Sequence, residues 1–252
     1  MKPLITLRRP LAGLFSLLKM GLLLGLGTVP LAAQAQDKGP PRLSLKVGGI
    51  YANLTGDDFK QLAGPDYTTR LGNRHLGYQA GAALRIPVSQ HGALAIQPEL
   101  LLSMRGYRIE GDRTSGLATG EASSSFTQKR ALTYLDLPLL ANVNLQGWFL
   151  EFGPQFGYLV HTKAETTTTT RFADGSPEKS TSTSSTGKSD LTRFDIGVIG
   201  GVGYQTTGGL SLGLRLNRGL TAVLDPAGAT SKPKAYNDAL MLQAAYLLPA
   251  GR

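Results

Sequence analysis

Residues 134–160 read YLDLPLLANVNLQGWFLEFGPQFGYLV, with apolar and polar side chains alternating along two arms. Successive side chains of a strand point to opposite faces, so each arm has two different faces. One face carries leucine and aromatic residues such as Leu137 and Phe152, and the other carries glycine, amides and carboxylates such as Asp136 and Glu151. Each arm is longer than the usual strand of about 5–6 residues. The stretch therefore predicts a pair of strands that crosses an outer membrane.

The same alternation recurs along the chain. The predicted strands are eight in number, and bacterial outer-membrane barrels have an even number. Their ranges are 43–52, 77–87, 93–109, 130–145, 148–162, 190–205, 210–218 and 238–248. The fold class predicted is an all-β, eight-stranded antiparallel up-and-down transmembrane barrel.

The connections alternate strictly between short and long. Three are short and contain glycine, as hairpin turns do: 88–92, 146–147 and 206–209. Four are long and polar: 53–76, 110–129, 163–189 and 219–237. This alternation places all short turns at one end of the barrel, which outer-membrane barrels direct to the periplasm. Because 163–189 is rich in Ser and Thr, we expect it to be a mobile loop without a core.

The first residues have the pattern of a secretory leader. Bases precede an apolar run that ends at Ala33-Gln34-Ala35, a small-x-small cleavage signal. An uncleaved membrane helix is the alternative, but the uncharged stretch 20–33 is shorter than the roughly 20 residues of a helical span. We therefore predict a signal peptide at 1–35, a short periplasmic lead-in at 36–42 and a barrel domain at 43–248.

Composition restricts the partners. The formal net charge of +9 falls to +5 once the leader's four bases are removed, and the remaining bases are scattered. Because the bases are scattered and the leader predicts export, we expect no nucleic-acid partner, and we expect outer-membrane lipid to surround the protein. The absence of cysteine fits an exported protein that does not rely on disulfides.

The alternation assigns charged residues to the inside of the barrel, the reverse of a soluble lipocalin-type barrel. They are Lys46, Arg85, Glu99, Arg105, Asp136, Glu151, Arg193, Asp195 and Arg215. An eight-stranded barrel is just wide enough for its own side chains, so we expect a salt-bridge network that fills the lumen. A narrow ion or proton path is the alternative.

Several motifs resemble the PorT-like family of outer-membrane β-barrels. They are QPELLLS at 97–103 with Arg105-Gly106, YLDLPLL at 134–140, FGP at 152–154, and DIG at 195–197 leading to GVGY at 201–204. The resemblance implies a leader followed by one outer-membrane barrel. The founding member is linked to protein secretion, which makes secretion machinery a candidate partner.

Catalytic patterns are weak. His91 falls in a short turn, whereas His75 and His161 lie near the long-loop end, where Asp57 and Asp58 could approach them. No nucleophile elbow and no metal-ligand spacing of Cys or His appear in the sequence. We therefore predict no catalytic, cofactor or metal site.

The function predicted is that of a non-enzymatic protein of the bacterial outer membrane. It would act as a scaffold that binds a protein partner, either secretion machinery or a surface ligand. The first alternative is a small pore or solute channel, and a rim hydrolase or acyltransferase using His161 or His75 is the second.

Overall fold

The computed structural model describes residues 39–56, 66–89, 92–184, 190–225 and 233–249. The chain separates into two compact units, 1–37 and 38–252, and only the second contains described residues. The predicted signal peptide at 1–35 and the start of the lead-in at 36–42 lie outside the described residues.

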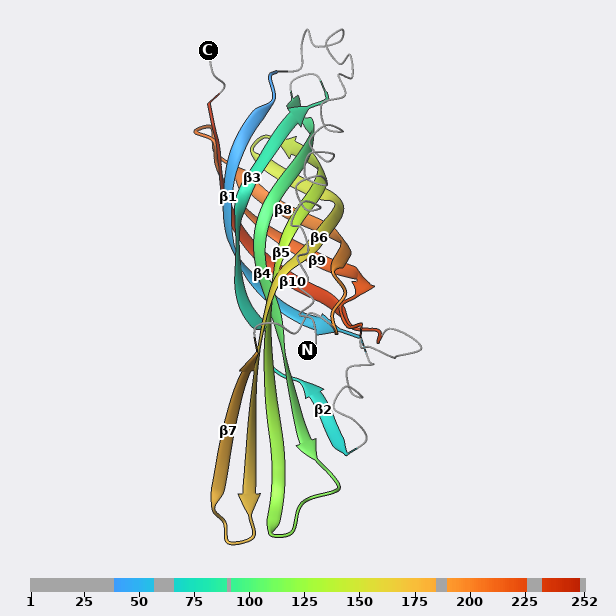
Figure 1. The fold of residues 1–252 in the computed structure, drawn as a ribbon. Helices are drawn as coiled ribbons and strands as arrows, with labels where there is room; N and C mark the ends of the chain where they lie inside the picture. The colour runs from blue at the N-terminus through green and yellow to red at the C-terminus, as the bar shows by residue number, and fades with distance from the viewer. Residues whose placement is uncertain (1–38, 57–65, 90–91, 185–189, 226–232, 250–252) are drawn as a thin grey trace, which may run out of the picture. The chain divides into compact units, whose positions relative to one another are not determined.

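Eight strands of the second unit close into a ring (Figure 1). Their bounds are β1 Arg42–Thr55, β3 His75–Pro87, β4 Leu94–Arg113, β5 Glu121–Leu145, β6 Trp148–Phe172, β8 Phe194–Gln205, β9 Leu210–Ala222 and β10 Tyr236–Leu247. Every ring neighbour is antiparallel, and pairing of β1 with β10 joins the first strand to the last. The predicted fold class is confirmed.

The two faces of the ring are as the alternation predicts. Leu137 and Phe152 are 51% and 65% exposed on the outside, whereas Asp136 and Glu151 between them are 2% and 3% exposed. A one-residue slip in register would exchange these faces, so the pattern fixes the pairing of each strand. The outer wall is therefore apolar and the inner wall polar.

The β5–β6 turn shows how the short connections are made. Gln146 and Gly147 have φ values of 53° and 95°, the positive values that a two-residue type I′ turn requires at both positions. The Asn144 side chain accepts a hydrogen bond from the Gly147 backbone N–H at 3.2 Å. The β3–β4 and β8–β9 connections lie at the same end of the barrel, which we call the turn end; the opposite end is the loop end.

Exposed aromatic pairs on β6 and β8 mark two levels of the outer wall. Trp148 packs edge-on against Tyr204 near the turn end, and Tyr158 packs against Phe194 toward the loop end, with ring centroids 5.4 and 5.2 Å apart. The eleven residues from Trp148 to Tyr158 match the 9–11 residues of a tilted membrane-crossing strand. Interfacial aromatic girdles of outer-membrane barrels occupy such positions.

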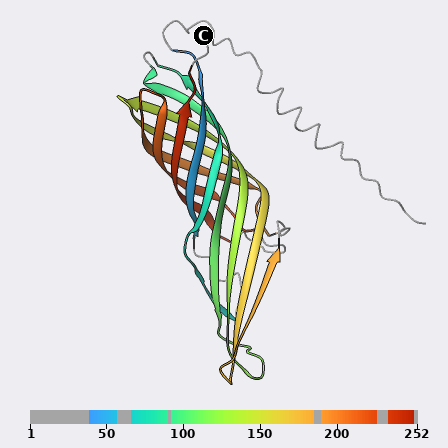
Figure 2. The same ribbon diagram turned by 90° about the vertical axis from the view of Figure 1, so that its left-hand side faces the viewer.

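Three of the long connections are not the loops that the sequence predicts. Strands β4, β5 and β6 continue past the ring, where β2 (Tyr67–Leu71) pairs with β4 and β7 (Pro177–Ser184) pairs with β6. Together they form an antiparallel sheet, ordered β2-β4-β5-β6-β7, that projects from the loop end (Figures 1 and 2). We call it the projecting sheet.

The correction is largest for 163–189, which we expected to be a mobile loop. Its residues up to Phe172 extend β6, and 177–184 form β7; residues 185–189 lie outside the described ranges. Threonine is β-branched and favours strands, and Thr166–Thr170 pair on one side with β5 and on the other with β7. The expectation of a mobile loop rested on low sequence complexity and took no account of the preference of threonine for strands.

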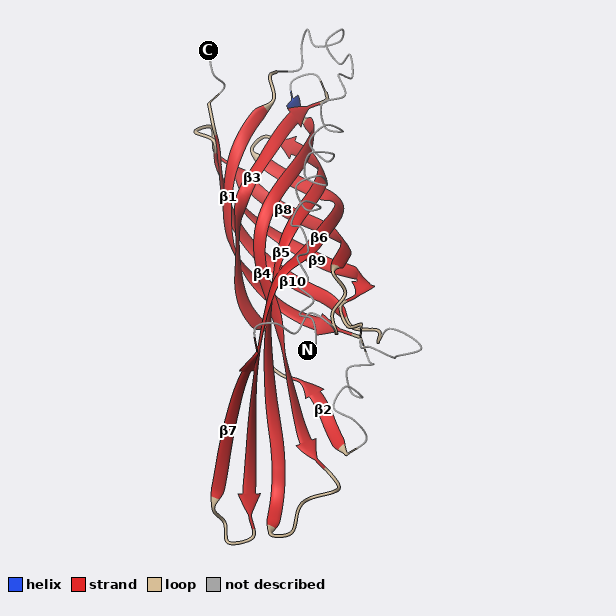
Figure 3. Ribbon diagram, viewed as in Figure 1, coloured by secondary structure: helices blue, strands red, loops and turns tan. Residues whose placement is uncertain are grey.

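Little of the described chain is anything but strand (Figure 3). None of the described residues form a helix with the length and apolar character needed to traverse a membrane.

Candidate functional site in the barrel lumen

The inward face of six ring strands brings ionised side chains to the barrel axis. Lys46 comes from β1, Glu99 and Arg105 from β4, and Glu151 from β6. Asp136, Asp195 and Arg215 complete the set from β5, β8 and β9. All seven are at most 5% exposed, so they face one another rather than solvent.

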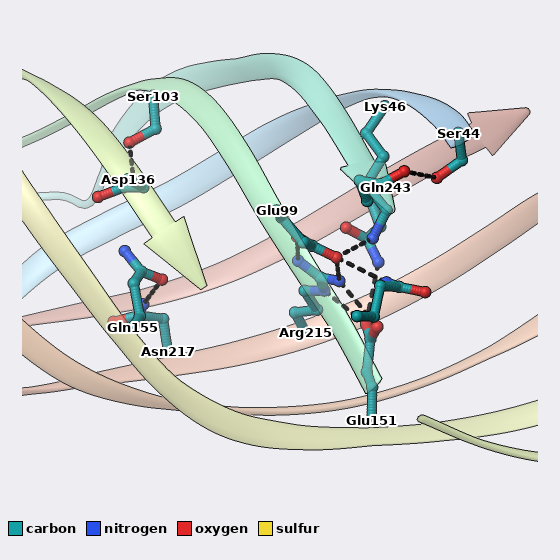
Figure 4. Close-up of polar contacts among 12 residues, drawn as sticks. Ser44, Lys46, Glu99, Ser103, Asp136, Glu151, Gln155, Arg215, Asn217 and Gln243 are labelled. Atoms are coloured by element: carbon teal, nitrogen blue, oxygen red, sulfur yellow. Dashed lines mark hydrogen bonds and ion pairs between the residues drawn. The ribbon is translucent and has the colours of Figure 1, made fainter. Parts of the chain in front are cut away.

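Arg215 is the centre of the first cluster (Figure 4). Its guanidinium, 0% exposed, donates to both carboxylate oxygens of Glu99 at 2.7 Å and also holds both oxygens of Glu151. Lys46 donates to Glu99 as well, and Gln243 donates to Glu151 at 3.0 Å. Two bases and two acids make this cluster neutral, which offsets the cost of burying each charge.

Arg105 is the centre of a second cluster, nearer the loop end. It donates to both oxygens of Asp136 and, at 3.1 Å, to Asp195, while its guanidinium lies over the Tyr134 ring. Asp136 also accepts from Ser103, and Asp195 accepts from Asn237 at 2.9 Å. This cluster has two carboxylates and one arginine, so one negative charge has no base to balance it. The hydroxyl of Ser103 and the amide of Asn237 stabilise the carboxylates by hydrogen bonds instead.

An apolar cluster lies beyond the Arg105 cluster, toward the loop end. It buries side chains from strands and from the loop-end connections: Leu54, Tyr107, Ile109, Leu132, Tyr134, Leu159, Leu191, Val223, Leu224 and Ala235. Leu191 precedes β8 and Leu224 follows β9, two neighbouring strands of the ring, and the two residues form an isolated β-bridge. The backbone N–H of Thr192 donates to the Val223 carbonyl at 2.9 Å. We call this cluster the loop-end cap, because it places packed side chains across the mouth.

The sequence contains a signal for part of the cap that we did not use. Leu132 and Leu159 fall on the inward positions of β5 and β6, in register with Asp136 and Gln155. Apolar residues at inward positions near the loop end indicate a dry plug there. Leu191 also has the inward parity of Asp195 within the predicted strand 190–205, whereas Leu224 lies beyond the predicted strand 210–218 and has no such signal.

Arg130 and Asp190 form an ion pair beside the cap that the sequence did not predict. The Arg130 guanidinium donates to both oxygens of Asp190, at 2.5 and 2.8 Å, and it also hydrogen-bonds to Tyr107. These bonds lower the pKa of the Asp190 carboxyl below its ordinary value. The pair ties the start of the 190–192 segment to β5.

Two of the predicted lumen residues differ from the expectation. Arg193 is exposed and lies outside β8, which begins at Phe194, so its assignment to the lumen network is wrong. The Arg193 carbonyl still accepts a hydrogen bond from the Leu159 backbone N–H of β6 at 2.8 Å, but the Arg193 side chain is not among the buried lumen residues. Arg85 faces inward but is half-buried at the turn end, where its partners are Gln205 and the Gly92 carbonyl.

The candidate catalytic histidines do not form a site in the described part of the chain. His161 is exposed on β6, and the Nε2 atom of His75 is buried without a hydrogen-bond partner. Neither side chain bonds to a described Ser, Asp or Glu; His91, Asp57 and Asp58 lie outside the described residues. No group of three or more metal-ligating side chains occurs among the residues described.

Comparison with protein families identifies the chain. The model of the family "outer membrane protein beta-barrel domain" matches residues 33–225, and the chain belongs to this family. It is accordingly a protein of the bacterial outer membrane, with lipid against the apolar outer wall. The family description specifies a barrel and not an activity. A comparison with curated proteins finds no match.

Solved outer-membrane barrels are similar in architecture. The chain resembles Ail, the attachment invasion locus protein of Yersinia pestis, with 11% identity and a TM-score of 0.37 over 84% of this chain and 100% of that one. It also resembles the outer membrane protease OmpT of Escherichia coli, with 10% identity and a TM-score of 0.35 over 85% of this chain and 99% of that one. The outer membrane protein OprG of Pseudomonas aeruginosa has 13% identity to the chain and a TM-score of 0.31, over 85% of this chain and 98% of that one. No activity is transferred from these likenesses.

Proposed function

We propose that this member of the outer membrane β-barrel family is a non-conducting scaffold that presents its projecting sheet to a protein partner outside the cell. The observation that carries the proposal is the filled lumen. Two ion-pair clusters and the loop-end cap occupy the bore in succession, which supports a lumen filled by side chains.

The projecting sheet supports the second half of the proposal. Strands β5 and β6 have 25 residues each, whereas a membrane crossing needs about 9–11. The remainder forms ordered structure outside the lipid, and every residue of β7 is exposed. An edge strand offers unpaired backbone donors and acceptors to which an extended segment of a partner can add.

Orientation follows from the general asymmetry of such barrels. Their short turns face the periplasm and their long connections face outward, which places the projecting sheet at the cell surface. A surface ligand is therefore the partner that the geometry favours. The PorT-like resemblance adds a narrower version, in which the partner belongs to a secretion system.

Planar-bilayer recording tests the closed lumen. The purified barrel is expected to give no stable open current, since each cluster would have to separate before ions could pass. The small-pore alternative predicts steady single-channel steps. A steady current in the wild-type protein would overturn the scaffold proposal.

Site-specific photo-crosslinking tests the partner. A photoreactive residue in place of Thr183 on β7 is expected to capture a protein in intact cells. Capture should also occur from the exposed position of Thr181 on the same strand, and it should be absent from Thr207, which is exposed in the short connection between β8 and β9 at the turn end. Equal capture from Thr183 and Thr207, or none from either position of β7, would contradict a role for the sheet.

A further inference from the structure

A cavity of about 470 Å³ lies at the turn-end mouth, on the opposite side of the ion-pair clusters from the loop-end cap. Strand ends and the lead-in line it: Gly39, Pro40, Arg42, Arg85, Pro87, Gly92, Asn144, Gln205 and Leu247. Its volume falls within the roughly 300–1,000 Å³ of small-molecule sites.

Two arginines face each other in this cavity. Arg42 on β1 and Arg85 on β3 are directly opposite in the ladder, and like charges in that position repel. Their neighbours Leu43 and Leu84 are exposed on the outer wall, so both arginines point inward. The ladder thus holds two positive charges together at the barrel mouth.

The hydrogen bonds of these arginines go to neutral groups. Arg42 donates through Nε to the Leu248 carbonyl at 3.2 Å. Arg85 donates to Gln205 Oε1 at 2.9 Å and to the Gly92 carbonyl at 3.2 Å. Within the described ranges neither forms an ion pair, in contrast to Lys46, Arg105 and Arg215.

Further donors remain available around the cavity. A guanidinium has five N–H donors, and these bonds use one from Arg42 and two from Arg85. The side-chain oxygens of Asn144 and Gln205 accept bonds from Gly147 and Arg85, which leaves their amide N–H₂ groups to donate. The cavity wall is therefore rich in donors and positive in charge.

We propose that the turn-end mouth is a binding site for a phosphate group, held by Arg42 and Arg85 with help from Asn144 and Gln205. Planar guanidinium groups bind phosphate oxygens in pairs, which a single lysine cannot do. The phosphate could belong to a soluble periplasmic compound or to the head group of an anionic lipid. The inward direction of both arginines favours the soluble source. This site is independent of the projecting sheet and of any partner there.

Calorimetric titration of the full-length protein in neutral detergent, with pyrophosphate as the probe, tests the site. Saturable binding is expected for the wild type, weakened at least tenfold by Arg42→Gln or Arg85→Gln. Arg85→Lys should fall between, because it keeps the charge and loses the paired donors. Arg218→Gln removes an exposed charge at the loop end and should bind as the wild type does.

A second arm distinguishes the two sources of phosphate. Native mass spectrometry of protein released from nanodiscs containing phosphatidylglycerol reports retained lipid, compared between wild type and Arg85→Gln. Pyrophosphate binding that depends on Arg85 supports a soluble ligand, and lipid retention that depends on Arg85 without pyrophosphate binding supports a head group. Retention and titration both unchanged by Arg85→Gln in a correctly folded barrel would overturn the proposal.

Discussion

Replacement of Arg215 by methionine removes the charge at the centre of the lumen while keeping a long side chain. Arg215 is fully buried and donates to both Glu99 and Glu151. The variant leaves two buried carboxylates with Lys46 as the one described base in their cluster. Removing one partner of a buried ion pair costs about 3–5 kcal/mol, and we expect a loss of stability in that range.

Urea unfolding in neutral lipid vesicles measures this loss. Trp148 is the one tryptophan of the chain and is 60% exposed on the outer wall, so its fluorescence changes when the barrel leaves the lipid. The midpoint and slope of the transition give the free energy of unfolding. The wild type and the variant are compared at the same pH and salt concentration.

The double variant Glu99→Gln, Arg215→Met is the matched control. It leaves Lys46 and Glu151, one base and one acid, so the cluster is again neutral. Residues that share an ion-pair network are coupled by about 0.5–3 kcal/mol, and the double variant should lose less stability than the sum of its single variants. A cost below ~1 kcal/mol for Arg215→Met, or strict additivity, would refute the idea that the cluster is held by charge balance.

Three further outcomes are expected. Gly153→Ala should lower the free energy of unfolding by about 1–3 kcal/mol, because a Cβ there would lie 2.1 Å from a backbone oxygen of β5. Gly49→Ala is the control: its Cβ meets no atom within 4 Å, and the variant should be as stable as the wild type in the same urea titration. Asp190→Asn should destabilise the barrel at neutral pH. Because the pKa of Asp190 is lowered in the folded state, its contribution is present above its unfolded pKa and is lost as pH falls through the folded value; the difference from wild type should vanish in acid, and a constant difference would argue against the ion pair. Leu137→Arg places a charge on the lipid face and should lower the free energy of unfolding by up to about 2–4 kcal/mol. The same change at Thr181, which is exposed on β7 outside the lipid, should have little effect on stability.

The wall of the barrel was predictable because each of its residues has only two directions to face. Period-two alternation requires no knowledge of distant contacts, and glycine-containing turns fix where strands reverse. The predicted strand 148–162 has the same start as β6 and the same inward set, from Glu151 to Gly157. The loop-end boundaries were not predictable in this way, because polar strands outside lipid carry no apolar alternation.

The interior was only partly predictable. Alternation along each strand placed Glu99, Glu151 and Arg215 inside the barrel. Their contact with one another depends on the order and the stagger of the strands, which alternation does not give. Arg193 lies two residues before the inward Asp195, so alternation assigned it to the lumen. It precedes the first residue of β8, and its side chain is exposed, which alternation within a strand does not predict.

By itself, the sequence determined which side of each strand meets lipid and how many strands close the barrel, since both depend on local alternation. The tertiary structure alone decided which buried charges share a cluster, which loop residues cap the bore, and how the Ser/Thr-rich segment becomes a sheet. These outcomes depend on residues that lie far apart in the chain and become neighbours only when the ring closes.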